Sequence, residues 1–301
     1  MQYDAIVIGG SFAGLSAATY IARGMRTVCV IDAGLPRNRF ADASHGFFAQ
    51  DGSSPLKMIA TARGQLGRYP AVRLIDGKAV SASGQDGGIE VTLAEGGTLT
   101  ASKLVLAFGL TDDLPDIPGL QERWGKSVLH CPYCHGFEFA GRRQGVLNTA
   151  SHSFHQAQLI AQWGPTTFFL NGAAPLDREQ RLAMEARDVS VEHGRVAALH
   201  GEGSQLGAIA LEDGRRIPVE ALYLAPRSRL NSSIAEELGC TIGVSPLGPM
   251  ISTNPDRMTN VPGVYAVGDI AQAPHNVASA AASGVSAGMG VHRALFFGSA
   301  T

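Results

Sequence analysis

Cys131 and Cys134 form a Cys-x-x-Cys pair near the middle of the chain. Such a pair brings two sulfur atoms close enough to form and break a disulfide, and its surroundings can lower the pKa of one thiol. His135 follows directly, and Glu138 comes three residues later. An imidazole beside a thiol can accept its proton or, when charged, lower the thiol's pKa. We predict a redox-active dithiol with His135 as its acid–base group and Glu138 as a supporting carboxylate.

Other interpretations of these residues remain open at this point. Cys-x-x-Cys-His is also the attachment pattern of c-type haem, which needs a secreted protein and an axial ligand. A zinc site needs a second pair of ligands, whereas Cys29 and Cys240 lie far apart in the sequence. His135 could instead cap the following helix, and Glu138 could be solvated. We favour the redox dithiol and predict no metal site. We place Cys29 in the core, and Cys240 in the core or in a turn.

A glycine-rich segment follows the first apolar run of the chain. Gly9, Ser11 and Gly14 occupy the positions of a G-x-G-x-x-G pattern, with serine replacing the middle glycine. In that pattern the N-terminus of a helix binds a pyrophosphate, and an acid after the next strand binds a ribose. Asp32 ends the next apolar run and supplies that acid. These residues predict a dinucleotide site.

The elements around these residues alternate between strands and helices. Strands at 4–8 and 27–32 flank a helix at 15–23, which makes one β-α-β unit. A second alternating pattern covers residues 125–240, and the chain returns to the first domain at 263–269 before a helix at 277–295. We predict an α/β fold with two Rossmann-like, three-layer ββα nucleotide-binding domains, the first interrupted by the second. The expected boundaries are 1–113 and 244–301 for the first domain, and 114–243 for the inserted one.

Composition narrows the function further. The chain has 301 residues and a net charge of −2, which gives no electrostatic basis for binding nucleic acid or an anionic membrane. No apolar run approaches the ~18–20 residues of a spanning helix, and the start of the chain lacks the basic segment of a signal peptide. Four cysteines are too few for a disulfide scaffold. We therefore expect a cytoplasmic protein in a reducing compartment.

The whole chain resembles low-molecular-weight thioredoxin reductases in the order and spacing of its motifs. The motifs are residues 9–14, Asp32, and residues 104–109, 131–136 and 267–269. The sequence of residues 131–138, Cys-Pro-Tyr-Cys-His-Gly-Phe-Glu, is similar to that of FAD-dependent dithiol oxidases that close disulfides in gliotoxin- and holomycin-type natural products. It is also similar to deep-rooted thioredoxin reductase variants that do not use NADPH.

This resemblance implies a homodimeric flavoprotein in which Cys134 lies nearer the flavin and Cys131 reacts with the substrate. The last helix would point its N-terminus at the flavin and stabilise the anionic reduced form. The family usually has threonine where this chain has Phe108. The residues implied to contact FAD are Gly9, Gly10, Ser11, Phe12, Ala13, Gly14, Asp32, Ala33, Arg39, His45, the backbone at Val80, Ala107, Phe108, Gly109, Gly268, Asp269, Asn276 and Val277.

The inserted domain lacks the second nucleotide motif that an NADPH-dependent reductase needs. Residues 145–155 hold no G-x-G-x-x-G, and His152 and Phe154 are bulky residues that would crowd a pyrophosphate. No basic cluster directly follows the next strand, since Arg178 and Arg181 come later, on a helix. We expect that this domain does not bind NADPH.

Three functions follow from these observations. The first is an FAD-dependent dithiol oxidase, in which a small-molecule dithiol reduces the cysteine pair, the pair reduces FAD, and O2 reoxidises FAD to give H2O2. The second is a disulfide reductase that acts on a thioredoxin-like protein and takes electrons from a donor such as ferredoxin. The third is a flavin-binding redox sensor without turnover. We favour the oxidase.

Overall fold

The computed structural model describes residues 2–85 and 88–298. These residues fold into two units. The larger unit contains a seven-stranded sheet in the order β3-β2-β1-β6-β5-β4, with β19 also paired to β6. β4 and β5 run antiparallel to their neighbours, whereas the other pairings are parallel. The strands are β1 (Gln2–Ile8), β2 (Val28–Asp32), β3 (Val72–Asp76), β4 (Ala79–Gln85), β5 (Gly88–Leu93), β6 (Thr98–Leu106) and β19 (Val264–Ala266).

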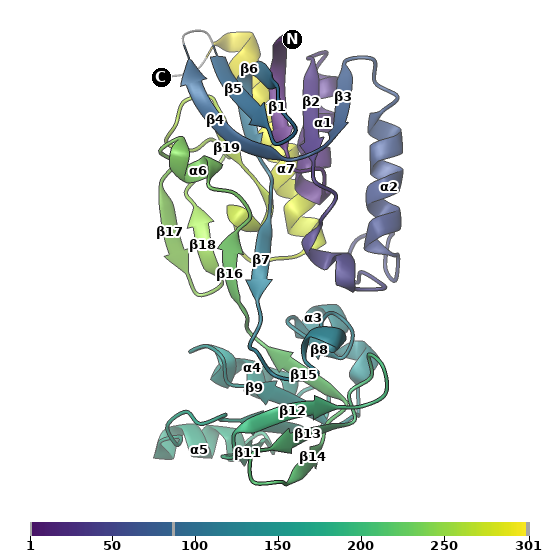
Figure 1. The fold of residues 1–301 in the computed structure, drawn as a ribbon, viewed down its shortest axis with the longest axis vertical. Helices are drawn as coiled ribbons and strands as arrows, with labels where there is room; N and C mark the ends of the chain where they lie inside the picture. Colours follow the sequence, from purple (N-terminus) through teal and green to yellow (C-terminus); the bar gives the residue numbers. More distant parts are fainter. Residues whose placement is uncertain (1, 86–87, 299–301) are drawn as a thin grey trace.

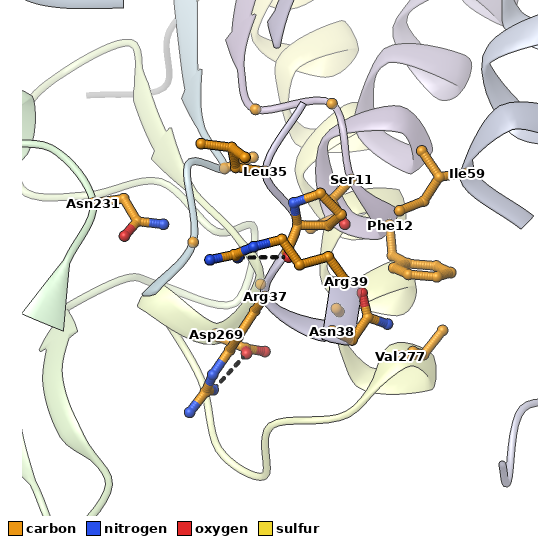
Figure 2. Close-up of a pocket in the computed structure, with 18 of the residues that line it drawn as sticks. Ser11, Phe12, Leu35, Arg37, Asn38, Arg39, Ile59, Asn231, Asp269 and Val277 are labelled. Carbon is orange, nitrogen blue, oxygen red and sulfur yellow. Dashed lines mark hydrogen bonds and ion pairs between the residues drawn. The ribbon is translucent and has the colours of Figure 1, made fainter. Parts of the chain in front are cut away.

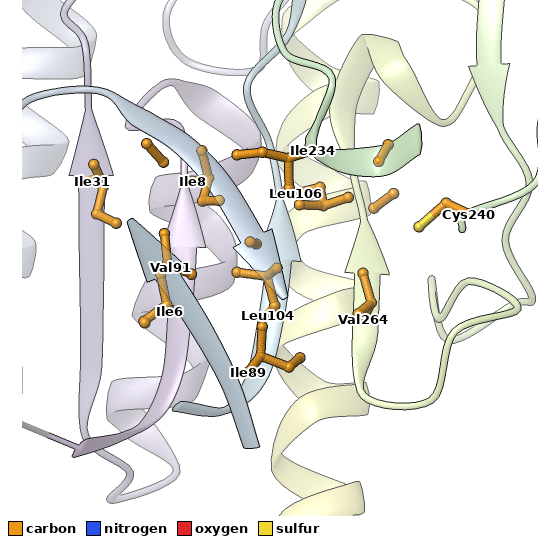
Figure 3. Close-up of a cluster of buried hydrophobic side chains, with 14 of the residues drawn as sticks. Ile6, Ile8, Ile31, Ile89, Val91, Leu104, Leu106, Ile234, Cys240 and Val264 are labelled. Atoms are coloured by element: carbon orange, nitrogen blue, oxygen red, sulfur yellow. The ribbon is translucent and has the colours of Figure 1, made fainter. Parts of the chain in front are cut away.

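The central strands of this sheet are buried on both faces. Along β1, Ile6 and Ile8 pack into one hydrophobic cluster while Val7 packs into another on the opposite face. Leu104 and Val105 of β6 divide in the same way. Side chains alternate between faces along a strand, so a strand covered on both sides has a continuous apolar sequence. Figure 3 shows the first of these clusters.

Helices α1 (Phe12–Arg23) and α7 (Val277–Phe297) lie side by side against one face of the sheet (Figure 1). Ala17 and Ile21 of α1 share a buried cluster with Ala287 and Val291 of α7. The small alanine side chains allow the two helices to pack closely. α2 (Pro55–Leu66) adds Ile59 and Leu66 to the same cluster. This packing fixes the N-termini of α1 and α7 next to the ends of the strands.

The smaller unit has a five-stranded parallel sheet in the order β11-β10-β9-β15-β8, and an antiparallel sheet in the order β12-β13-β14. Together with the larger unit, it confirms the predicted fold class of two Rossmann-like units. Helix α5 begins with a capping box between Asp177 and Gln180. The elements are β8 (Val128–Leu129), α3 (Pro132–His135), β9 (Gln144–Leu147), α4 (Ser153–Ile160), β10 (Thr166–Phe169), α5 (Arg178–Glu185), β11 (Ser190–Glu192), β12 (Val196–His200), β13 (Ala208–Leu211), β14 (Arg216–Pro218) and β15 (Ala221–Leu224).

Two antiparallel strands, β7 (Leu110–Asp113) and β16 (Arg227–Leu230), connect the units (Figure 1). The elements after β16 are α6 (Ile234–Glu237), β17 (Ile242–Ser245) and β18 (Gly248–Ile251). Ile234 and Cys240 are buried in the same cluster as the sheet of the larger unit (Figure 3). The chain therefore returns to the larger unit at β16, before the boundary at 243 that the sequence predicted.

Among the described residues, no helix combines the length and the apolar character needed to cross a membrane.

Candidate functional site

A cavity of about 690 Å³ lies between the glycine-rich segment of the larger unit and α3 of the smaller one. Gly9 bends the chain at the end of β1 with φ of 114°, and an added Cβ would lie 2.2 Å from the carbonyl oxygen of Ala107. Only glycine fits that position. Ser11 is the N-cap of α1, and its side chain makes no capping hydrogen bond. The N–H groups of the first turn of α1 therefore receive no side-chain cap from Ser11, as a pyrophosphate site requires.

Asp32 is held in place at the end of β2. Its carboxylate accepts hydrogen bonds from the Arg63 guanidinium at 2.9 Å and from the Gly34 N–H at 3.1 Å. Arg63 also contacts Asp76 at 2.6 Å. Asp32 and Arg63 both line the cavity. The acid that the sequence predicted to bind a ribose thus lies in the cavity wall, and Arg63 is a second polar group that the sequence did not reveal.

Arg37 joins the cavity wall to the connection between the units. Its guanidinium donates to both carboxylate oxygens of Asp112 on β7, at 2.9 and 2.5 Å. It also donates to Asp269 at 2.8 Å (Figure 2). Ser228 of β16 donates to Asp112 at 3.0 Å. Burial disfavours the charge on Arg37, but the two carboxylates outweigh it and raise the pKa of Arg37. In turn Arg37 lowers the pKa of Asp112, although burial acts in the opposite direction.

Two histidines border this charged cluster. The Nδ1 atom of His275 lies 2.9 Å from Arg37. Desolvation, followed by the charge of Arg37, lowers the pKa of His130 to about 4. Desolvation also lowers the pKa of His275. Both imidazoles are therefore neutral near pH 7, and Arg37 carries the positive charge of the cluster.

The dithiol faces the same cavity. Cys131 is the N-cap of the short helix α3, and Cys134 lies one turn along. Both cysteines are free thiols in the structure. A hydrogen bond from the Cys134 thiol and backbone N–H groups of Cys134 and Tyr133 lower the pKa of Cys131 to about 7. That shared hydrogen bond, with burial, raises the pKa of Cys134. Cys131 therefore carries the thiolate of the reduced pair.

His135 lies beside a second histidine, His45. Their rings are perpendicular, with centroids 6.4 Å apart. Partial burial lowers the pKa of His135, while Glu138 acts in the opposite direction. Glu138 does not line the cavity, and its Oε1 atom lies 3.4 Å from Nε2 of His45. The structure thus brings the predicted acid–base pair together with a residue that was expected to contact the cofactor.

The predicted cofactor residues fall into two groups. Gly14 and Val80 do not line the cavity. Gly14 instead allows α1 to approach β1, since an added Cβ would lie 1.9 Å from the Gly9 carbonyl oxygen. Val80 is 40% exposed, and its neighbours Lys78 and Ala79 line the cavity instead. The predicted residues that line it are Gly9, Gly10, Ser11, Phe12, Ala13, Asp32, Ala33, Arg39, His45, Ala107, Phe108, Gly109, Gly268, Asp269, Asn276 and Val277.

The sequence did not predict several polar residues of the cavity. Arg37 and Asn38 belong to a polar, irregular segment with no periodic pattern, and its run of arginines was the available signal. Their partners come from distant parts of the chain, so sequence spacing could not pair them. Other polar lining residues that were missed include Arg63, Asp112, His130, Asn231 and His275.

The loop between β9 and α4 lies in the segment where the sequence lacks a second phosphate-binding motif. The Ser153 hydroxyl accepts hydrogen bonds from the backbone N–H groups of Thr149, at 3.2 Å, and Ala150, at 3.1 Å. The Thr149 hydroxyl donates to the Ala225 carbonyl at 2.8 Å. A phosphate-binding loop needs such N–H groups for its ligand. In this chain two of them already have an intramolecular partner.

Across residues 2–85 and 88–298, no group of three histidine, cysteine, aspartate or glutamate side chains is arranged to hold a metal ion.

This fold and dithiol define a disulfide oxidoreductase of the thioredoxin reductase type. The chain matches the pyridine nucleotide-disulphide oxidoreductase family over residues 3–147 and 173–284, and it belongs to that family. The family and its thioredoxin reductase-like relatives confirm the resemblance predicted from the motifs, and they imply a flavin cofactor. The match omits residues 148–172, which include the loop closed by Ser153.

Similar proteins cover nearly the whole chain. Thioredoxin reductase tcpT of Claviceps purpurea is 34% identical over 95% of this chain and 92% of its own. An oxidoreductase from Agrobacterium tumefaciens has a crystal structure that is 41% identical, with a TM-score of 0.95 over 99% of this chain and all of its own. The crystal structure of HlmI is 34% identical, with a TM-score of 0.92 over 98% of this chain and 92% of its own.

Proposed function

We propose that this protein is an FAD-dependent dithiol oxidase that transfers electrons from a dithiol substrate through Cys131 and Cys134 to FAD and then to O2. FAD, when bound, would accept the electron pair of the dithiol and deliver it to O2 as H2O2. The observation that carries the proposal is the single cavity that contains both the dinucleotide-binding loop and the cysteine pair. The loop closed by Ser153 supports an electron source other than NADPH.

Residues at both ends of the cavity fit the two ends of FAD. Asp32 would bind the adenosine ribose, and the first turn of α1 would bind the pyrophosphate. Asn276 caps α7 through a hydrogen bond from the Ser279 N–H at 2.7 Å, and both Asn276 and Val277 line the cavity. The positive end of the α7 dipole would stabilise negative charge on the reduced flavin.

The thiol chemistry follows from the different pKa values of the two cysteines. A substrate thiolate would attack Cys131 in the oxidised pair, which breaks the Cys131–Cys134 bond and forms a mixed disulfide. The second substrate thiol would then displace Cys131, and this closes the substrate disulfide. A thiol of low pKa leaves faster in such an exchange, and the pKa of Cys131 is about 7. The cysteine pair keeps the two electrons that the substrate gives up. Cys134 keeps one of the two protons as its thiol, and the other proton must leave the site, because Cys131 carries the thiolate.

The surface beside the dithiol favours an apolar substrate. Tyr133 and Phe137, on either side of Cys134, are 74% and 83% exposed. Phe48 is 93% exposed and lies in the loop that carries His45, whose ring approaches His135. Solvent-exposed aromatic side chains in the segments that carry the dithiol and His45 would provide apolar contact area for a small molecule. We therefore propose a small-molecule dithiol as the substrate.

An oxygen electrode tests this proposal. The purified flavoprotein, mixed with dithiothreitol as a model dithiol, should consume O2 and produce one H2O2 for each dithiol oxidised. A Cys134→Ser variant should retain flavin and lose this activity. Thioredoxin reduction driven by reduced ferredoxin, without dithiol-dependent O2 uptake, would overturn the oxidase and establish a reductase in its place.

A further inference from the structure

His45 has partners that a cofactor contact does not explain. Its imidazole lies between two carboxylates, with Nδ1 3.5 Å from Oδ2 of Asp51 and Nε2 3.4 Å from Oε1 of Glu138. The Gly46 N–H donates to the other oxygen of Asp51 at 2.8 Å, which fixes that carboxylate and lowers its pKa. Two partners on opposite nitrogens fix the orientation of the ring.

These groups extend from the dithiol toward solvent. Cys134, His135 and His45 all line the cavity. The exposed fraction of the side chain increases from 22% for His45 to 38% for Glu138 and 74% for Asp51. An acid–base group near the thiols is therefore followed by others of increasing exposure, and the last one is in contact with water.

Oxidation of the dithiol requires such a route. A dithiol substrate gives up two electrons and two protons when its disulfide forms. An anionic reduced flavin keeps both electrons and one of the protons, so one proton must leave the site when the disulfide forms. Burial lowers the pKa of His135 and disfavours its charged form, so a proton that reaches this imidazole must move onward.

We propose that His45, together with Glu138 and Asp51, carries this proton from His135 to solvent. The inference rests on the proposed reduction of flavin by a dithiol and is independent of the final electron acceptor. It assigns a function to Asp51 and gives His45 a role beyond contact with the cofactor. The charged or titratable groups that act on His135 are Glu138 and His45. Tyr223 of β15 interacts electrostatically with both cysteines and with Glu138.

Proton release during one anaerobic turnover tests the relay. The holoprotein is mixed with dithiothreitol in weak buffer containing a pH indicator dye, and flavin bleaching and proton release are followed together. In wild type, one proton per flavin should appear at the rate of bleaching. In His45→Gln, release should lag bleaching by at least about tenfold, because a transfer group is missing, and added imidazole should restore it. Asp51→Asn should cause a smaller lag, and exposed His200→Gln should cause none.

Each outcome distinguishes this inference from the proposed function. If wild-type flavin does not bleach with dithiol, both fail. If it bleaches and His45→Gln releases its proton at the wild-type rate, with no effect of imidazole, the relay is wrong and the oxidase stands. If His45→Gln fails to fold, imidazole dependence in Asp51→Asn decides the question, since its absence there contradicts the relay.

Discussion

The two active-site cysteines differ in chemistry although only two residues separate them. Cys131 accepts the hydrogen bond of the pair and two backbone N–H groups, whereas Cys134 donates and is penalised by burial. Charge-assisted hydrogen bonds to sulfur favour the thiolate, so the thiolate belongs to Cys131. This assignment agrees with the proposed role of Cys131 as the sulfur that exchanges with substrate.

Alkylation of the reduced protein should reveal this difference. Cys131 should react with iodoacetamide with a half-maximal rate near pH 7, since its pKa is about 7 and only the thiolate reacts. A depressed pKa means that reactivity is present above pH 7 and is lost as the pH falls below it. Peptide mass spectrometry over a pH series measures each cysteine separately.

Two other cysteines provide internal controls for that experiment. Cys29 and Cys240 are buried, and desolvation raises the pKa of Cys29 to about 11 and that of Cys240 above its usual value. Both should react more slowly than Cys131 throughout the series. Reaction of Cys134 ahead of Cys131 would contradict the assignment of the thiolate.

At the scale of single residues, the sequence predicts those functional residues whose partners lie close to them in the chain. Cys131, Cys134 and His135 are adjacent in the chain, and Gly9 and Asp32 follow strands in a recognisable pattern. The positions of most of these residues are determined by one element and the element next to it in the chain. Residues whose partners come from several segments were missed. Arg37 and Asp112 are 75 positions apart, and no spacing rule connects them.

At the scale of elements, Arg37 holds four segments together. Its guanidinium contacts Asp112 on β7, which pairs with Ser228 on β16, and it also contacts Asp269 and His275 at the cavity. The side chains of Arg37 and Asp112 are only 17% and 9% exposed. Removing one member of a buried ion pair leaves the other charge desolvated and unpaired, and this is strongly destabilising.

Arg37→Ala should therefore lower the free energy of unfolding by about 3–5 kcal/mol, measured by urea denaturation with circular dichroism. Arg229→Ala is the matched control, because Arg229 pairs with Asp113 on the same two strands but both side chains are more than half exposed. The control should change stability by less than about 1 kcal/mol. A similar small change in both variants would show that the Arg37 pair does not hold the connection.

Acid should weaken the same contact in wild type. The folded-state pKa of Asp112 lies below its usual value, so the pair contributes stability above the ordinary aspartate pKa of about 3.9 and loses it as the pH falls further.

The elements themselves were largely predictable. Apolar runs predicted strands at 4–8 and 27–32, and the structure has β1 and β2 there. The predicted boundary at 243 lies after the point where the chain re-enters the larger unit. The sequence did not reveal this because α6 is short and its few residues show no clear helical periodicity. Ile234 reveals its unit only through tertiary packing against the sheet.

At the scale of the whole molecule, two units meet at one cavity. The larger unit provides the dinucleotide-binding loop, and the smaller one brings α3 and its dithiol to the same space. The smaller unit has a parallel sheet of the Rossmann type. In the loop after β9, however, two backbone N–H groups already donate to the Ser153 hydroxyl. We infer that the smaller unit acts in this protein as a carrier of the dithiol, with no nucleotide of its own.

The visible spectrum of the purified protein under anaerobic conditions tests this central claim most directly. Dithiothreitol should bleach the oxidised flavin, and NADPH at the same concentration should leave it yellow at catalytic times, because the N–H groups of Thr149 and Ala150 are already bonded to Ser153. Admission of air after the dithiol should restore the yellow colour and yield H2O2. Rapid and complete bleaching by NADPH would contradict the account and identify a nucleotide-dependent reductase.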